Sequence, residues 1–293
     1  MQITFHGVRG SLASPGPETA SFGGNTSCVH VRLACGTHLI LDAGTGIRRL
    51  GNQLVEHSDP LHLLLTHSHW DHIQGFPFFA PLFQPEREIH ICRSLPERDA
   101  EYNGVLEQMN GHNFPVPRTR LPSRTRYMED PDAFFAGHDF QFARRALNHP
   151  GGGNAYRITA DGASLAFVTD NELNPPAAPA TSWDEWVAFC RDVDVLIHDA
   201  QYLSSDMPRK HGYGHSLVSE VRQLDRTDLE VERILRESEV WFETMKSRTS
   251  CLCAWEGLTL EVSRRAGDLP CFQINADRPF GLARPMTDNM RLR

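Results

Sequence analysis

A dense group of metal-binding side chains directly follows a short apolar segment of this sequence and limits the folds it can adopt. Residues 61–65 read LHLLL, which is typical of a buried strand, and residues 66–72 continue as THSHWDH. The candidate ligands in this segment are His67, His69, Asp71 and His72. A lone H-x-H pair is common, whereas H-x-H-x-D-H after a buried strand is specific. Because imidazole and carboxylate together suit zinc, manganese or iron, the sequence predicts a transition-metal site at the edge of a sheet.

Two further candidate ligands follow other apolar segments. His149 comes after residues 140–147 and Asp170 after residues 164–169, and both segments read as strands. Taken alone, each side chain fits a solvated loop residue. Beside the histidine motif, both are expected at the same sheet edge. A glycine run follows His149 and would allow the chain to approach a ligand closely.

Asp42 and His215 each have a structural and a functional interpretation. Asp42 ends a strand-like segment, and it fits either a cap of the helix that follows or a partner that fixes the tautomer of a metal-bound histidine. His215 lies in the segment GYGHS, where it fits the start of a helix, and its functional interpretation comes only from resemblance to a known family. For His198 and Asp199, which end another strand-like segment, we favour structural packing.

The rest of the pattern predicts an α/β protein. Several expected strands are apolar on both faces, which implies sheets covered by helices or by another sheet. Asp161 and Gly162 are a two-residue hairpin signal, because both tolerate a positive φ. The expected strands are residues 37–41, 61–65, 88–92, 140–147, 155–159, 164–169 and 193–198. The expected helices are residues 46–56, 183–192, 216–222 and 228–246.

Length, charge and cysteine content narrow the range of domain arrangements and functions that the chain can have. At about 100–200 residues per domain, the 293 residues indicate one large domain over 1–263, followed by an irregular tail over 264–293. The net charge of −8 gives no basic footprint, which disfavours non-specific binding to nucleic acid. No segment reads as a signal peptide or a membrane span. The seven scattered cysteines disfavour a disulfide framework, so we expect a cytoplasmic protein.

On these motifs, the chain resembles the metallo-β-lactamase superfamily, in particular the phosphodiesterase branch that includes ribonuclease Z and the phosphoribosyl cyclic phosphodiesterases. The resemblance covers residues 1–220 and resumes over the long expected helix, residues 228–246, and the segment AWEGLTL, residues 254–260. It implies a four-layer αββα sandwich with a dinuclear metal site at one edge of the two sheets. It assigns His67, His69 and His149 to the first metal, and Asp71 and His72 to the second. Asp170 would bridge both metals, Asp42 would orient the ligand histidines, and His215 would be a general acid or a clamp on the phosphoryl oxygen.

The function that the resemblance implies is metal-dependent hydrolysis, with a small or cyclic nucleotide-type phosphodiester as the expected substrate. Two divalent ions, zinc or manganese, would hold a bridging hydroxide with the help of Asp71 and Asp170, and His215 would protonate the leaving oxygen. The expected partner is a small phosphodiester, with no membrane and no nucleic acid, and a homodimer is compatible with the sequence. Two alternatives stay open: a thioester hydrolase, and a single-metal or non-catalytic sensor with the same fold.

The sequence departs from the family at one point. The second metal normally receives another histidine from a later strand, but no histidine follows His215. The second site therefore has three protein ligands at most and is expected to be weak or empty. Three explanations of the missing histidine are open. There is a natural deletion near residues 220–226, or His215 is a substitute ligand, or residues are absent from the sequence as printed.

Overall fold

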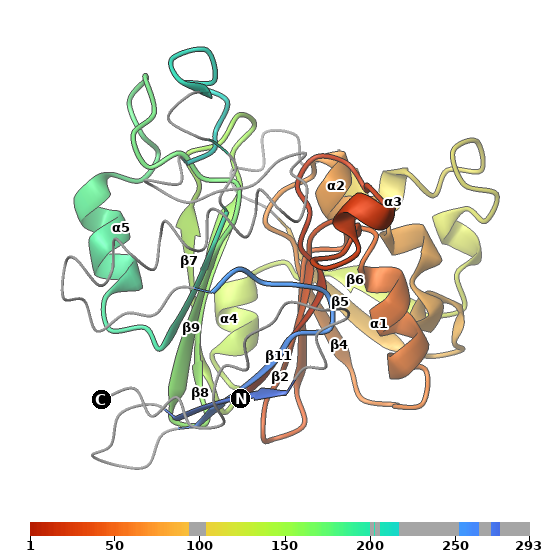
Figure 1. The fold of residues 1–293 in the computed structure, drawn as a ribbon. Helices are drawn as coiled ribbons and strands as arrows, with labels where there is room; N and C mark the ends of the chain where they lie inside the picture. The colour runs from red at the N-terminus through yellow and green to blue at the C-terminus, as the bar shows by residue number, and fades with distance from the viewer. Residues whose placement is uncertain (94–103, 200–201, 203–205, 217–251, 264–270, 276–293) are drawn as a thin grey trace.

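The computed structural model describes residues 1–93, 104–199, 202, 206–216, 252–263 and 271–275. Within these residues the chain builds two sheets that face each other, with helices outside them (Figure 1). The helices are α1 (Ile47–Leu54), α2 (Trp70–Ile73), α3 (Gly104–Glu107), α4 (Pro131–Phe135) and α5 (Trp183–Cys190). Short 3-10 helices are η1 (Pro17–Thr19), η2 (Phe76–Phe78), η3 (Ala80–Phe83) and η4 (Arg118–Arg120).

The larger sheet has the strand order β12-β11-β1-β2-β3-β4-β5-β6. Its strands are β1 (Gln2–Gly7), β2 (Cys28–Arg32), β3 (His38–Leu41), β4 (Leu61–Leu64), β5 (Glu88–Cys92), β6 (Arg124–Tyr127), β11 (Thr259–Ser263) and β12 (Cys271–Asn275). β3, β4, β5 and β6 run parallel, and the other pairs are antiparallel. The segments after β3 and β4, which carry Asp42 and the histidine motif, therefore leave the sheet at the same edge.

The smaller sheet has the order β10-β9-β8-β7. Its strands are β7 (Gln141–Ala146), β8 (Asn154–Ala160), β9 (Ala163–Val168) and β10 (Val195–His198). β8 is antiparallel to both β7 and β9, and β10 is parallel to β9, so β7, β9 and β10 share one direction. Their carboxyl ends carry His149, Asp170 and Asp199 to one edge.

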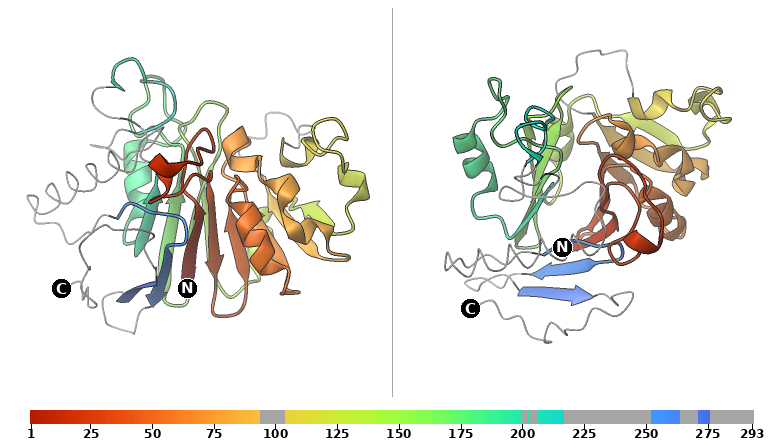
Figure 2. Two further views of the ribbon diagram at one scale, coloured as in Figure 1. Left: turned by 45° about the vertical axis from the view of Figure 1, so that its right-hand side comes forward. Right: turned by 45° about the horizontal axis from the view of Figure 1, so that its top comes forward.

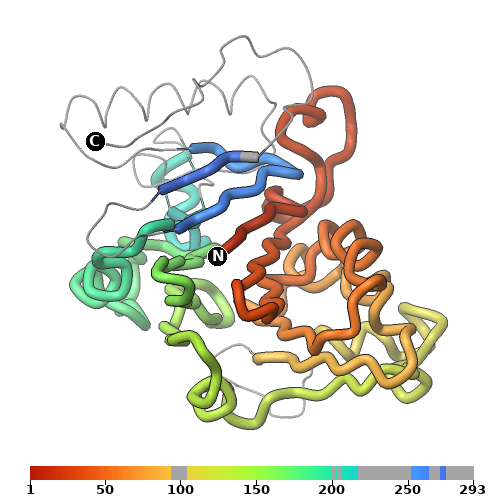
Figure 3. The backbone as a smooth tube through the Cα atoms, turned by 90° about the horizontal axis from the view of Figure 1, so that it is seen from below, coloured from red at the N-terminus to blue at the C-terminus, as the bar shows by residue number. Residues whose placement is uncertain are grey.

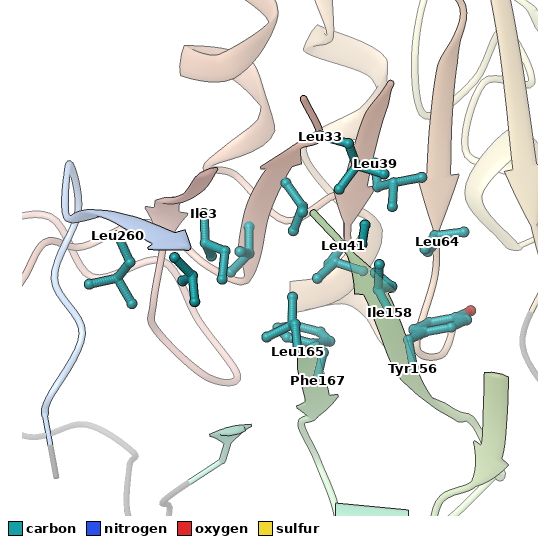
Figure 4. Close-up of a cluster of buried hydrophobic side chains, with 14 of the residues drawn as sticks. Ile3, Leu33, Leu39, Leu41, Leu64, Tyr156, Ile158, Leu165, Phe167 and Leu260 are labelled. Carbon is teal, nitrogen blue, oxygen red and sulfur yellow. The ribbon is translucent and has the colours of Figure 1, made fainter. Parts of the chain in front are cut away.

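Three apolar clusters separate four layers. The cluster between the sheets joins side chains of β1, β3 and β4 to Tyr156, Ile158, Leu165 and Phe167 of the smaller sheet (Figure 4). A second cluster lies between the larger sheet and α1, where Ile47, Leu50 and Leu54 are buried. A third lies between the smaller sheet and α5, through Trp186 and Phe189. Figure 2 shows the two sheets with helices on their outer faces, which is the predicted αββα arrangement.

Most of the expected elements are present within one or two residues of their predicted bounds. The predicted hairpin is confirmed, since Asp161 and Gly162 have φ values of 56° and 72° and Ala160 pairs with Ala163. The expected helices over 216–222 and 228–246 lie almost entirely outside the described residues, and so does the stretch 220–226, where the sequence analysis expects the family strand to be absent. No helix among the described residues is both long enough and apolar enough to cross a bilayer.

One expectation about the tail is wrong. Residues 271–275 form strand β12, which pairs in antiparallel register with β11, and β11 in turn pairs with β1, so that β12 is the edge strand of the larger sheet (Figure 3). The rest of the 264–293 tail lies outside the described residues. Just before β11, the Glu256 carboxylate accepts hydrogen bonds from the backbone and the side-chain amide of Asn25 at 2.6 and 2.9 Å. The segment at 254–260 is thereby joined to the loop before β2.

Candidate metal centre

Asp170 lies at the centre of the predicted ligands. Its Oδ2 atom is 3.3 Å from His72 Nε2, 3.6 Å from His67 Nε2 and 3.8 Å from His149 Nε2. These side chains come from both sheets, because the histidine motif follows β4, whereas His149 and Asp170 follow β7 and β9. A single carboxylate oxygen surrounded by imidazole nitrogens is the arrangement that a bridging ligand would need.

The cluster divides into two groups that could each hold a cation. One group is His67, His69, His149 and Asp170, and the other is Asp71, His72 and Asp170. Within each group, one ligand atom per residue lies within 4.8 Å of the others. The structure therefore brings together every residue that the sequence analysis assigned to metal, and places Asp170 in both groups. Their roles as ligands stay predictions.

Two buried nitrogens test whether a metal fits. His67 Nε2 and His72 Nε2 are shielded from solvent and have no hydrogen-bond partner within the described part of the chain. An unpaired buried polar atom costs about 1–3 kcal/mol, so two of them beside one carboxylate are unfavourable unless a cation accepts their lone pairs. The donor set, imidazole with carboxylate, suits zinc or manganese.

The opposite ring nitrogens are held in the state that a metal ligand requires. His149 Nδ1 lies 2.9 Å from the carbonyl of Gly214, and His72 Nδ1 lies 2.7 Å from Asp42 Oδ2. Each Nδ1 donates its proton there, so in the neutral ring Nε2 carries the lone pair that a metal would take. Burial lowers the pKa of His67, His69 and His149, so these imidazoles stay neutral near pH 7.

Asp42 positions the histidine motif. It is fully buried, and besides His72 it accepts hydrogen bonds from the backbone and the hydroxyl of Thr66, both at 2.8 Å, and from Ser27 at 3.0 Å. Asp42 and Asp170 both have positive φ values, 63° and 54°, which place each carboxylate just past the end of a buried strand. Such a backbone is uncommon for residues other than glycine and often occurs at functional sites. The interpretation of Asp42 as an orienting partner matches these contacts.

The second group concentrates negative charge around His72. Burial alone would lower the pKa of His72, but Asp170, Asp42 and Asp71 raise it well above the ordinary value. Asp71 Oδ2 is 3.3 Å from His72 Nε2 and also accepts a hydrogen bond from the backbone of Ser11 at 2.7 Å. In the absence of a metal, three carboxylates converge on one imidazole, and a divalent cation would neutralise them.

His215 lies at the edge of this cluster and not inside either group. Its Nδ1 is 3.2 Å from Asp199 Oδ2, and its Nε2 is 3.9 Å from Asp170 Oδ2. Burial would lower the pKa of His215, but the hydrogen bond to Asp199 and the charge of Asp170 raise it. Packing alone therefore does not describe Asp199, contrary to our expectation. The sequence places Asp199 at the end of a strand-like segment but carries no signal for its contact with His215.

Glu172 is a residue that sequence reasoning missed. It is buried and accepts hydrogen bonds from the backbone of Gly212, at 2.9 and 3.1 Å, and of Gly214, at 3.0 Å. These bonds hold the loop that supplies both the carbonyl bound by His149 and the side chain of His215. The available signal was a carboxylate two residues after a candidate ligand, which has no distinctive meaning in a sequence.

Known proteins share the fold described above. The model of a family described as the beta-lactamase superfamily domain matches residues 37–251. No curated protein has a matching sequence. Among solved structures, the chain is similar to the metallo-beta-lactamase fold protein YhfI from Bacillus subtilis, with a TM-score of 0.61 and 16% identity over 89% of this chain and 99% of that one.

Two further structures are similar at comparable coverage. Zn²⁺-bound PqqB from Methylobacterium extorquens gives a TM-score of 0.56 and 14% identity, over 89% of this chain and 100% of that chain. The short form of human tRNase Z, ELAC1, gives a TM-score of 0.51 and 16% identity, over 89% of this chain and 99% of that chain. At these identities the likeness establishes the fold alone.

Proposed function

Because this chain belongs to the metallo-β-lactamase superfamily, we propose that it is a metal-dependent hydrolase whose substrate is a small or cyclic nucleotide-type phosphodiester. The observation that carries the proposal is the convergence of His67, His72 and His149 on one oxygen of Asp170, with the Nε2 atoms of His67 and His72 buried and without a hydrogen bond among the described residues. When bound there, divalent zinc or manganese supplies Lewis acidity and lowers the pKa of a water molecule.

The chain's own residues have different roles in the proposed reaction. His67, His69, His149 and Asp170 hold one cation, and Asp71, His72 and Asp170 hold the other, more weakly because one family histidine is missing. His215 presents Nε2 towards the same oxygen of Asp170, and Asp199 holds its Nδ1. In the proposed reaction, His215 donates the proton on Nε2 to the leaving oxygen.

A cation near His215 supports an anionic substrate. The Lys210 ammonium lies 5.5 Å from the ring centre of Tyr202 and 5.1 Å from that of Tyr213, and the Tyr202 ring is 5.6 Å from the ring of His215. Within the described residues no carboxylate pairs with Lys210, so its charge is available to a substrate phosphate. The net charge of −8 is a sum over the whole chain, and two bound divalent cations would add positive charge at the place where an anionic substrate must bind.

The primary test is hydrolysis of bis(p-nitrophenyl) phosphate by the wild-type chain, with and without added Zn²⁺ or Mn²⁺. We expect turnover that depends on the metal. Turnover of a thioester but of no phosphodiester would instead favour the thioester hydrolase. Metal binding with no turnover of either would favour the sensor.

The leaving-group dependence of a His215→Ala variant tests the proton donor. A general acid contributes about 10²–10⁴-fold to a rate. We expect a loss of that size on a phosphodiester with an alkoxide leaving group, such as a 2′,3′-cyclic nucleotide. On bis(p-nitrophenyl) phosphate the loss should be much smaller, because p-nitrophenolate leaves without protonation. Equal losses on both substrates would contradict the proposed role and indicate that His215 binds metal or supports the loop.

A Lys210→Ala variant tests the recognition of charge. A hydrogen bond to a charged group contributes about 1.5–3 kcal/mol, so KM for a phosphodiester should rise at least about tenfold while kcat changes less. Arg209→Ala is the matched control, because it removes a neighbouring exposed cation. If the two variants give the same KM, Lys210 does not contact the substrate.

A further inference from the structure

A second row of histidines crosses the outer face of the larger sheet, apart from the metal centre. His6 of β1, His30 of β2, His38 of β3 and His57 of the loop after α1 follow one another, with ring centres 6.3, 5.1 and 5.6 Å apart. None of these residues contributes to the proposed reaction. The row ends at the exposed side chains of His57 and Asp59.

We propose that His38, His57 and Asp59 form a separate binding site for a late first-row divalent ion such as Zn²⁺ or Ni²⁺. One ligand atom from each residue lies within 4.8 Å of the others. Two imidazoles and one carboxylate leave further coordination positions open to water. The proposal does not depend on the hydrolase activity.

The site lies at the opposite end of the strands from the Asp170 cluster. β3 and β4 are parallel, with His38 opposite Leu61 at their amino ends. His57 and Asp59 immediately precede β4, whereas the histidine motif follows its carboxyl end. The two sites are therefore separated by the length of a strand, and neither shares a residue with the other.

His38 is held ready to bind. It is buried, its Nδ1 lies 2.9 Å from His30 Nε2, and the two rings stack with an interplanar angle of 4°. This contact uses Nδ1, so Nε2 is the nitrogen left for a ligand. A partner on the second nitrogen fixes the ring and its tautomer, as is usual for metal-binding histidines. Burial is the main cause that lowers the pKa of His38, so the ring is neutral at pH 7.

The loop that carries the other two ligands has a fixed backbone and exposed side chains. The His57 amide donates to the carbonyl of Leu54 at 3.2 Å, and the Arg87 guanidinium donates to the carbonyl of His57. The backbone is thus held at both sides of His57. An ion can reach His57 and Asp59 from solvent without any opening of the fold.

Neighbouring charges and the imidazole ligands together determine which ion the site can bind. Arg32 and Arg87 lower the pKa of His38, whereas Asp59 raises it, so both cationic and anionic groups act on the site. The two arginines oppose a cation, and the bond to imidazole must offset that repulsion. Late first-row ions bind imidazole most strongly, whereas Mn²⁺ and Mg²⁺ favour oxygen ligands. We expect the site to take Zn²⁺ or Ni²⁺, more weakly than the Asp170 cluster, and to reject Mn²⁺.

Equilibrium dialysis of metal-stripped protein against Zn²⁺, followed by metal analysis, tests this site. The wild-type chain should bind one more Zn²⁺ at saturation than a His57→Ala/Asp59→Asn variant. In each single variant the affinity for that extra ion should fall by more than about tenfold, because loss of even an outer partner of a metal costs about that much. With Mn²⁺ in place of Zn²⁺, both chains should bind the same number of ions. His112→Ala removes another exposed histidine and should match the wild type.

The result that would overturn the proposal is equal Zn²⁺ content and affinity in the wild type and the double variant. Both substituted side chains are exposed, so the double variant is expected to fold. Hydrolysis of bis(p-nitrophenyl) phosphate with Mn²⁺ should be the same in both chains. That measurement separates this site from the proposed catalytic centre, because either can fail without the other.

Discussion

An Asp170→Ala variant is expected to lose metal-dependent hydrolysis and most of its metal at the cluster between the two sheets. Asp170 is the one carboxylate in both candidate groups, and its Oδ2 lies within 3.9 Å of the Nε2 atoms of His67, His72, His149 and His215. Removing even an outer-shell partner of a metal costs about 10–100-fold in affinity or activity. Removing a shared ligand should therefore lower kcat/KM for bis(p-nitrophenyl) phosphate by more than about a hundredfold.

Metal content and activity should be measured on the same preparations. Asp139→Ala is the matched control, because it removes an exposed aspartate before β7, at the opposite end of that strand from His149. It should keep wild-type metal content and turnover. Wild-type metal content in Asp170→Ala would contradict the bridging role. Retained turnover with metal lost would show that the hydrolysis does not use this centre.

Stripping the metal with a chelator is expected to lower the melting temperature by about 10 °C. A ligand present at 1,000 times its Kd stabilises a fold by about 4 kcal/mol, and for chains of this size about 1 kcal/mol corresponds to 2–4 °C. The cause is local: without a cation, Asp42, Asp71 and Asp170 crowd around His72, and the buried Nε2 atoms of His67 and His72 make no hydrogen bond among the described residues. Because the ligands come from both sheets, the loss should weaken the contact between them.

Scanning calorimetry with and without chelator measures the shift, and re-addition of Zn²⁺ or Mn²⁺ should reverse it. The Asp170→Ala variant is the informative comparison, since its melting temperature should respond little to the chelator. A wild-type melting temperature unaffected by chelation would mean that the cluster binds metal too weakly to stabilise the fold. The His57→Ala/Asp59→Asn variant should keep the full shift if Mn²⁺ is the ion supplied.

All seven strands that the sequence analysis expected are present in the structure, and residues 88–92 form β5 without change of bounds. Strands β1 and β2 were not predicted, although apolar and polar side chains alternate in parts of both. β6, RTRY, was missed because its side chains are mostly polar and only its pairing with β5 makes it a strand. β12 was missed for a similar reason: the tail mixes proline, glycine and charge, and its pairing with β11 is decided by tertiary contact.

The sequence determined which chemical groups are present and roughly where each leaves its sheet. The H-x-H-x-D-H motif, His149 and Asp170 each follow an apolar strand, and parallel strands bring their carboxyl ends to one edge. That pattern predicted a metal site at a sheet edge, and the resemblance to the family assigned the individual ligands. The absence of any histidine after His215 is likewise a property of the sequence alone.

Only the tertiary structure decided how these groups act on one another. The contact between Asp199 and His215, the hold of Glu172 on the 212–214 loop, and the grouping of His38, His57 and Asp59 all join residues whose spacing in the sequence carries no signal. Distances between side chains depend on how two sheets pack face to face. Local propensity and periodicity describe single strands and helices, and therefore do not contain that information.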